Sequence, residues 1–205
     1  MKILVVVAMS NEMKGIKEWI KSANLKTKLN IDYLCCWMWN YETISSLEHY
    51  LTKNPEPTFI RNIWICWYWN SKKEKKTEAI QVSNVINIHT EKESIIPPFL
   101  QLAPLKTCIS SENIVFEKPT FKNENLLTID EMYFDMESWW VELVASKYKL
   151  PRVLMKIPFD LVWKETESLV GDSEDMDIII SNMCKNLPYH DYLEKIIMRI
   201  KQQNL

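Results

Sequence analysis

Three acidic residues stand where α/β proteins place functional side chains. Glu12 follows the apolar run at residues 2–8, Glu137 follows the run at residues 127–134, and Asp160 follows the run at residues 150–157. In open α/β sheets, ligands bind beyond the carboxyl ends of the strands. Carboxyl groups there can act as general acids or bases, so these three are the first candidates for chemistry. Taken singly, each is also an ordinary surface acid, which is stabilising near a helix N-terminus.

The elements that must position these acids follow from the apolar patterns. Continuous β-branched and aromatic runs predict core strands, and apolar residues at helical spacing predict helices between them. We expect strands at residues 2–8, 32–39, 60–69, 80–88, 107–109, 127–134 and 150–157, helices from residue 10 onward and at 43–51, 137–148 and 176–200, and a loop at 95–104. Alternating strands and helices predict a single α/β domain over residues 1–205, with a mixed or parallel sheet covered on both faces.

Composition excludes several classes of function. The chain has 2 glycines and 9 tryptophans among its 205 residues, which rules out a glycine-rich phosphate cradle. A net charge of -2 argues against nucleic acid as a partner. The five cysteines form no CxxC pair, and no histidine lies at metal-ligand spacing, so no metal site is expected. The N-terminal apolar run is too short to span a membrane, and we expect a cytoplasmic protein.

Two segments carry a resemblance to a known family. The opening MKILVVVAMSNEMKGIKEWI reads as a strand, Ala-Met and an acid, while FDMESWWVELVASKYKLPRVLMKIPFD reads as a Met-Glu helix start, a second strand and an aspartate. In these motifs the sequence resembles the 5'-methylthioadenosine/S-adenosylhomocysteine (MTA/SAH) nucleosidases of the purine nucleoside phosphorylase superfamily. The resemblance implies a three-layer sandwich, with a central mixed sheet flanked by helices.

The same resemblance implies a reaction and roles for its residues. Hydrolysis of a purine N-glycosidic bond passes through an oxocarbenium-like transition state, in which the base leaves protonated and water attacks the sugar. By resemblance, Asp160 protonates adenine N7, Glu12 activates the water, and Glu137 holds the ribose hydroxyls. The matching substrate-binding positions are Met136, Lys156 (arginine in the family), Phe159 (serine in the family), Ile114, Val115 and Trp69. The resemblance also implies a purine nucleoside substrate, no cofactor, and a homodimer.

Two departures from the family leave a second reading open. Where the family has glycine-containing turns, this chain reads CWMWN at residues 36–40 and CWYWNSK at residues 66–72. Tryptophan cannot take the backbone conformations or allow the close ligand approach that glycine provides. Retention of all three acids favours an active nucleosidase with a remodelled pocket. The alternative is a pseudoenzyme, a structural or regulatory subunit whose pocket is filled by Trp37, Trp39, Trp67 and Trp69.

A third reading takes the paired aromatic residues as a surface for nucleic acid. They would stack bases beside the basic run at residues 72–76. The sequence pI near 6.0 favours the simpler interpretation that these aromatic side chains pack in the core at strand ends.

Overall fold

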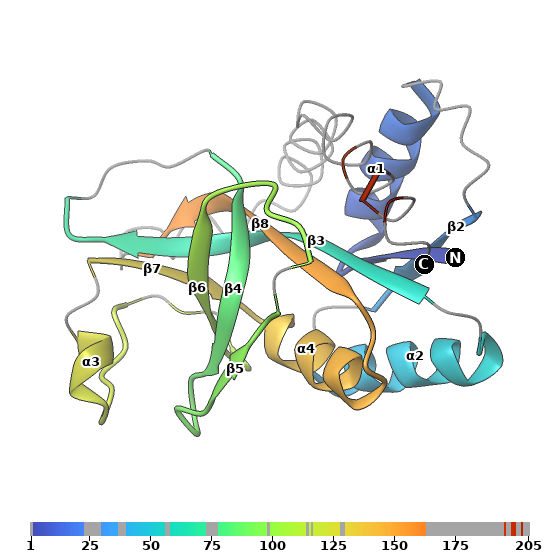
Figure 1. Ribbon diagram of the computed structural model, residues 1–205. Helices are drawn as coiled ribbons and strands as arrows, with labels where there is room; N and C mark the ends of the chain where they lie inside the picture. The colour runs from blue at the N-terminus through green and yellow to red at the C-terminus, as the bar shows by residue number, and fades with distance from the viewer. Residues whose placement is uncertain are drawn as a thin grey trace.

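The computed structural model of this protein describes residues 2–22, 30–36, 40–55, 58–72, 78–97, 99–113, 115, 117–127 and 130–162, with the isolated positions 195, 198, 199 and 202 (Figure 1). The helices are α1 (Ser10–Ser22), α2 (Asn40–Lys53), α3 (Glu124–Leu127) and α4 (Ser138–Lys147). The strands are β1 (Lys2–Val7), β2 (Asn30–Cys35), β3 (Thr58–Asn70), β4 (Ile80–Asn87), β5 (Glu93–Ile95), β6 (Leu105–Ser110), β7 (Glu131–Asp135) and β8 (Arg152–Leu161).

The described strands form one mixed sheet. Its hydrogen-bonded order is β2-β1-β3-β7-β6-β4-β5, and β8 pairs with both β3 and β4. The first residues of β3 run parallel to β1, its last residues run antiparallel to β7, and β8 lies parallel along its other edge. Figure 1 shows β3 crossing most of the molecule, so this one strand joins the two halves of the sheet.

Helices cover both faces of the sheet around β1 and β3. Figure 1 shows α1 on one side, with α2 and α4 together on the other. Helix α1 contacts β1 and β2, α2 packs against α4 and β2, and α4 also contacts β4 and β6. The expected α/β sandwich with a central mixed sheet is confirmed.

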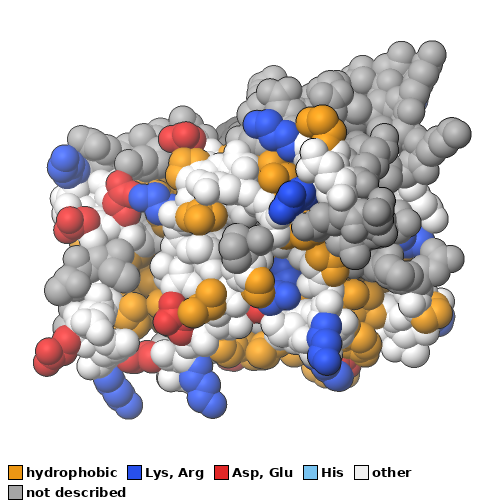
Figure 2. All heavy atoms as spheres, viewed as in Figure 1, with side chains coloured by type: hydrophobic (Ala, Val, Ile, Leu, Met, Phe, Trp, Pro, Cys, Tyr) orange, Lys and Arg blue, Asp and Glu red, His pale blue; other side chains and the backbone are white. Residues whose placement is uncertain are grey.

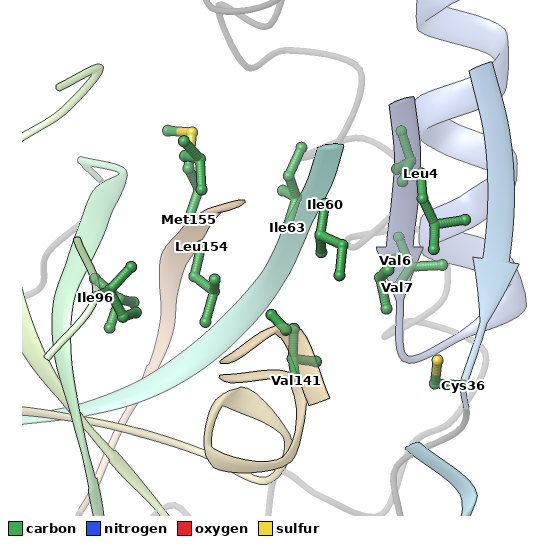
Figure 3. Packing of buried hydrophobic residues seen from close by; sticks show 14 of the residues in the cluster. Leu4, Val6, Val7, Cys36, Ile60, Ile63, Ile96, Val141, Leu154 and Met155 are labelled. Atoms are coloured by element: carbon green, nitrogen blue, oxygen red, sulfur yellow. The ribbon is translucent and has the colours of Figure 1, made fainter. Parts of the chain in front are cut away.

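The main core lies between this sheet and α4. Every residue of β1 is buried, as expected for a β-branched strand hydrogen-bonded to a neighbour on each edge. Figure 3 shows Ile60 of β3, Leu154 of β8 and Val141 of α4 meeting in this core. A second apolar cluster forms around β6 and β7 from Ile86, Ile109, Phe121, Leu126, Met132, Phe134 and Val162.

Lys149 takes a conformation that usually belongs to glycine. It follows the last turn of α4 with φ of 53°, in the left-handed region, and its N–H bonds to the Ser146 carbonyl at 3.1 Å. The next residue, Leu150, donates its N–H to the Ala145 carbonyl at 2.9 Å. Glycine is the usual residue at this place after a helix because it lacks a Cβ. A chain with so few glycines therefore ends α4 with a side chain in a strained position.

Three sequence expectations are corrected in detail. The last strand does not stop at residue 157: β8 continues to Leu161 because β3 remains its partner beyond a bulge at Cys66/Trp67, so Asp160 lies within the strand rather than after it. Leu127 ends the short helix α3 instead of opening a strand, and β7 begins at Glu131, where it meets β3. The expected 95–104 loop begins inside the three-residue β5, which pairs with β4.

One further expectation concerns a part of the chain that the structure hardly covers. Most of the expected helix at 176–200 lies outside the described residues. Among the described residues, no helix is long and apolar enough to cross a membrane.

On the face drawn in Figure 2, the described Lys and Arg side chains are scattered rather than gathered into one continuous basic surface.

Candidate active site

Glu12 is fixed at the start of α1, directly beyond the carboxyl end of β1. Its Oε2 accepts hydrogen bonds from the backbone N–H groups of Ala8 (3.1 Å) and Met9 (2.9 Å), and only 2% of the residue is exposed. Burial raises the pKa of Glu12 to about 7, against the opposing effects of its backbone hydrogen bonds and of Lys156. This carboxyl group can therefore exchange a proton near neutral pH.

Glu137 occupies the matching place between β7 and α4. It is buried, and its Oε2 accepts a hydrogen bond from the N–H of Met136 at 3.3 Å. Burial raises the pKa of Glu137 well above its usual range, and repulsion from Asp135 and Glu12 adds to this effect, while Lys156 opposes it. Glu12 and Glu137, far apart in the sequence, are thus close enough to influence each other's ionisation.

Lys156 of β8 supplies the positive charge that both glutamates experience. Its Nζ lies 2.5 Å from Oδ2 of Asp135 in an ion pair whose two side chains are 0% and 1% exposed. Burial by itself would lower the pKa of Lys156, but Asp135, Cys108 and Glu137 together raise it above its usual value. Burial is the main cause of the raised pKa values of Glu12 and Glu137, and Lys156 opposes that effect at both groups.

The fold of this chain is similar to that of several solved structures. No protein-family profile and no curated protein matches the sequence. The MTA/SAH nucleosidase from Chlamydia trachomatis is 17% identical with a TM-score of 0.67, over 94% of this chain and 98% of that chain. The Helicobacter pylori enzyme is 9% identical with a TM-score of 0.66, over 90% and 93%. The Streptococcus pneumoniae enzyme is 11% identical with a TM-score of 0.62, over 91% and 100%.

This chain has the fold of the MTA/SAH nucleosidases. The resemblance carried by the sequence motifs is therefore confirmed at the level of the fold. Identities this low leave residue roles to be argued from the site itself.

Within the nucleosidase fold, the structure brings some of the candidate residues together and places others elsewhere. Glu12, Glu137 and Lys156 interact in one buried cluster, and Met136 is buried beside Glu137. Val115 and Trp69 pack against the second apolar cluster, and Phe159 is half-buried in β8. The side chain of Asp160 and the whole of Ile114 lie outside the described residues.

The tryptophans that distinguish this chain also divide. Trp67 and Trp69 lie partly buried against the second apolar cluster, and the Lys118 ammonium lies 4.4 Å from the centre of the Trp69 ring. Trp37 and Trp39 lie outside the described residues, although Cys36, just before them, is close enough to Glu137 for each to affect the other's ionisation.

Asp135 is the member of the cluster that sequence reasoning missed. Its Oδ2 accepts hydrogen bonds from the N–H (3.0 Å) and Oγ (2.6 Å) of Ser138 as well as pairing with Lys156. The sequence feature that could have pointed to Asp135 is its place at the end of the apolar run of β7, two residues before Glu137. An acid at a strand end is common, and only the position of β8 reveals its partner.

Proposed function

We propose that this protein hydrolyses the N-glycosidic bond of purine nucleosides of the MTA and SAH type. The observation that carries the proposal is the burial of Glu12 and Glu137 in one interacting cluster, with a Glu12 pKa near 7. Solved structures with this fold support the substrate class, because one is bound to MTA and another to 8-aminoadenine.

Each of the three acids has a distinct task in this reaction. Glu12 accepts a proton from the attacking water, for which a pKa near the working pH is favourable. Glu137 holds the ribose hydroxyls and stabilises the positive charge that develops on the sugar. Asp160 protonates N7 of adenine, so that the base leaves as a neutral molecule.

The remaining candidates form the proposed substrate pocket. Met136 packs against the sugar and base, and its burial beside Glu137 is consistent with that place. The other proposed lining residues are Ile114, Val115, Trp69 and Phe159, whereas Lys156 belongs to the buried cluster with Glu12 and Glu137.

Release of adenine from MTA tests the proposal directly. Glu12→Gln and Asp160→Asn each remove one proton-transfer group, so we expect adenine release to fall by about 100- to 10,000-fold. Glu18→Gln is the matched control, because Glu18 lies on the exposed face of the same helix as Glu12. Wild-type release no faster than that of the two variants would overturn the proposal.

A pseudoenzyme is the second candidate. Trp67 and Trp69 pack against the second apolar cluster, and this favours the pseudoenzyme, because tryptophan side chains held in a core can occupy the space that a substrate would need. Two surface cavities, of about 680 and 700 Å³, are lined by residues other than Glu12, Glu137 and Lys156. This candidate predicts no adenine release and no thermal stabilisation by MTA or adenine, whereas a rise in Tm with ligand concentration would exclude a filled site.

We also propose that two copies of the chain associate through the outer face of α4. Leu143 is 41% exposed there and Trp140 is half-buried, and both line the cavity of about 700 Å³. Exposed large apolar side chains that adjoin one another are typical of interaction surfaces.

A further inference from the structure

The Asp135–Lys156 ion pair has no task in the reaction proposed above. Both side chains are almost fully buried, and Oδ1 of Asp135 has no hydrogen-bond partner among the described residues. Burying an ion pair costs solvation energy, and well-packed apolar residues often replace such pairs without loss of stability. A buried pair that leaves one oxygen unsatisfied is therefore poorly explained by stability alone.

Lys156 is surrounded from several elements. Asp135 faces it from β7, Glu137 from the start of α4 and Glu12 from α1, while the thiols of Cys66 on β3 and Cys108 on β6 complete its ionisable surroundings. Among these described groups, Lys156 is the one that carries positive charge.

Asp135 also determines where that charge lies. Its Oδ2 contacts the Lys156 ammonium and is held by the N–H and hydroxyl of Ser138 in the first turn of α4. Glu137 directly precedes this turn, and its carbonyl accepts the N–H groups of Trp140 and Val141 at 3.0 Å. The ammonium group is therefore anchored to the turn that Glu137 directly precedes.

We propose that Asp135 and Lys156 are positioning residues of the hydrolytic site: Asp135 holds the Lys156 ammonium near Glu12 and Glu137, and this buried positive charge favours the ionised form of the water-activating glutamate. The inference rests on the proposed function, since water activation is the task it serves. Lys156 then acts from behind the carboxylates and does not contact substrate. This replaces the substrate-binding role suggested by the family arginine.

The direction of the effect follows from the surroundings of Glu12. Backbone hydrogen bonds at Met9 and Ile65 lower the pKa of Glu12 against the effect of burial, and Lys156 lowers it further. Without the ammonium group the pKa of Glu12 would rise above about 7, so a larger fraction of Glu12 would be protonated at neutral pH and unable to accept a proton from water. Nearby opposite charge typically moves a carboxyl pKa by about one to three pH units.

Two measurements on the full chain test the inference. The first is the pH profile of kcat/KM for adenine release from MTA. The second follows the carboxyl carbons of 13C-labelled glutamate by NMR as pH is varied, with Glu12→Gln assigning the Glu12 signal. Lys156→Met removes the charge and Lys156→Arg keeps it. The double variant Asp135→Asn with Lys156→Met removes both partners, in case an unpaired Asp135 prevents folding of the single variant.

We expect Lys156→Met, or the double variant if the single one does not fold, to move the Glu12 titration and the acidic limb of the pH profile upward by about one pH unit or more. Lys156→Arg should restore both toward the wild-type values. A variant without positive charge that leaves the Glu12 titration in place would overturn the inference. If wild type releases no adenine, the proposed function fails, while the NMR titration still decides whether Lys156 controls Glu12.

Discussion

At the scale of single residues, Glu12 shows how burial creates a functional group. Acids in the first turn of a helix normally stay exposed, where they complement the helix dipole. The Glu12 carboxylate is instead buried and accepts hydrogen bonds from the N–H groups of Ala8 and Met9. Burial has the largest effect on its pKa. The property that suits it for accepting a proton also reduces the stability of the fold.

The stability cost of Glu12 is measurable. Its folded-state pKa is raised from 4.5 to about 7, so the native state binds a proton that the unfolded state releases, and stability falls as pH rises from about 4.5 to 7. Glu12→Gln removes this dependence. We expect the free energy of unfolding of wild type to fall by about 3 kcal/mol relative to the variant between pH 4 and pH 8.

Urea denaturation across this pH range checks the expectation. Glu18→Gln, on the exposed face of α1, should reproduce the wild-type profile. Parallel stability curves for wild type and Glu12→Gln would show that Glu12 titrates normally.

At the scale of elements, α4 connects the site to the sheet through a buried carboxylate. Glu142 is 0% exposed, pairs with Arg152 of β8 and accepts hydrogen bonds from Ser94 of β5 (3.1 Å) and Ser146 (2.7 Å). Arg152 is also largely buried, so neither charge can be hydrated when its partner is removed. This network fixes the helix that Glu137 directly precedes.

Removal of Glu142 should therefore be costly. Glu142→Ala leaves Arg152 without its carboxylate in a dry environment, and we expect a loss of about 3–5 kcal/mol in the free energy of unfolding. Glu48→Ala is the matched control, because Glu48 pairs with Lys147 at 2.5 Å on the surface and its loss should cost less than about 1 kcal/mol. Similar Tm values for the two variants would contradict this account of the network.

The end of α4 offers a change in the opposite direction. Lys149→Gly relieves a side chain held at φ of 53°, and we expect a gain of up to about 1 kcal/mol in stability. Equilibrium denaturation measures it. Lys147→Gly, at the last residue of the helix, should instead be destabilising, since glycine costs up to about 1 kcal/mol in a helical position and the ion pair with Glu48 is lost.

At the scale of the whole molecule, the outer face of α4 is the surface through which we propose that two copies of the chain associate. Leu143 lies beside Trp140 on this face, and both border a cavity that reaches the β4–β5 hairpin. The proposed homodimer would cover these side chains and stabilise the helix that positions Glu137.

Leu143→Lys should convert the proposed dimer to monomer, because a lysine placed in an apolar interface would lose its hydration. Sedimentation velocity measures the change. Leu105→Lys is the matched control: Leu105 is 42% exposed but lies on β6, lining the other cavity, and its substitution should leave the association unchanged. A wild-type chain that sediments as a monomer would remove the proposal.

Local sequence patterns were enough to predict most of the helices and strands. The β-branched run of β1 and the helical spacing in α1 and α4 specify those elements through short-range preferences. The extension of β8 through Asp160 and the short β5 were missed, because each exists only through pairing with a distant strand. The acids Glu12 and Glu137 were found since they stand at strand ends, whereas Asp135 stayed hidden until its partner was known.

The sequence by itself determined an α/β chain with acids at the ends of core strands, because side-chain periodicity and helix-start chemistry are local properties. Tertiary structure alone decided that Glu12, Asp135, Glu137 and Lys156 share one buried environment. Their ionisation depends on burial and on charges brought from α1, β7 and β8, which are separated along the chain. Such coupling depends on distance in space, so no local pattern in the sequence could reveal it.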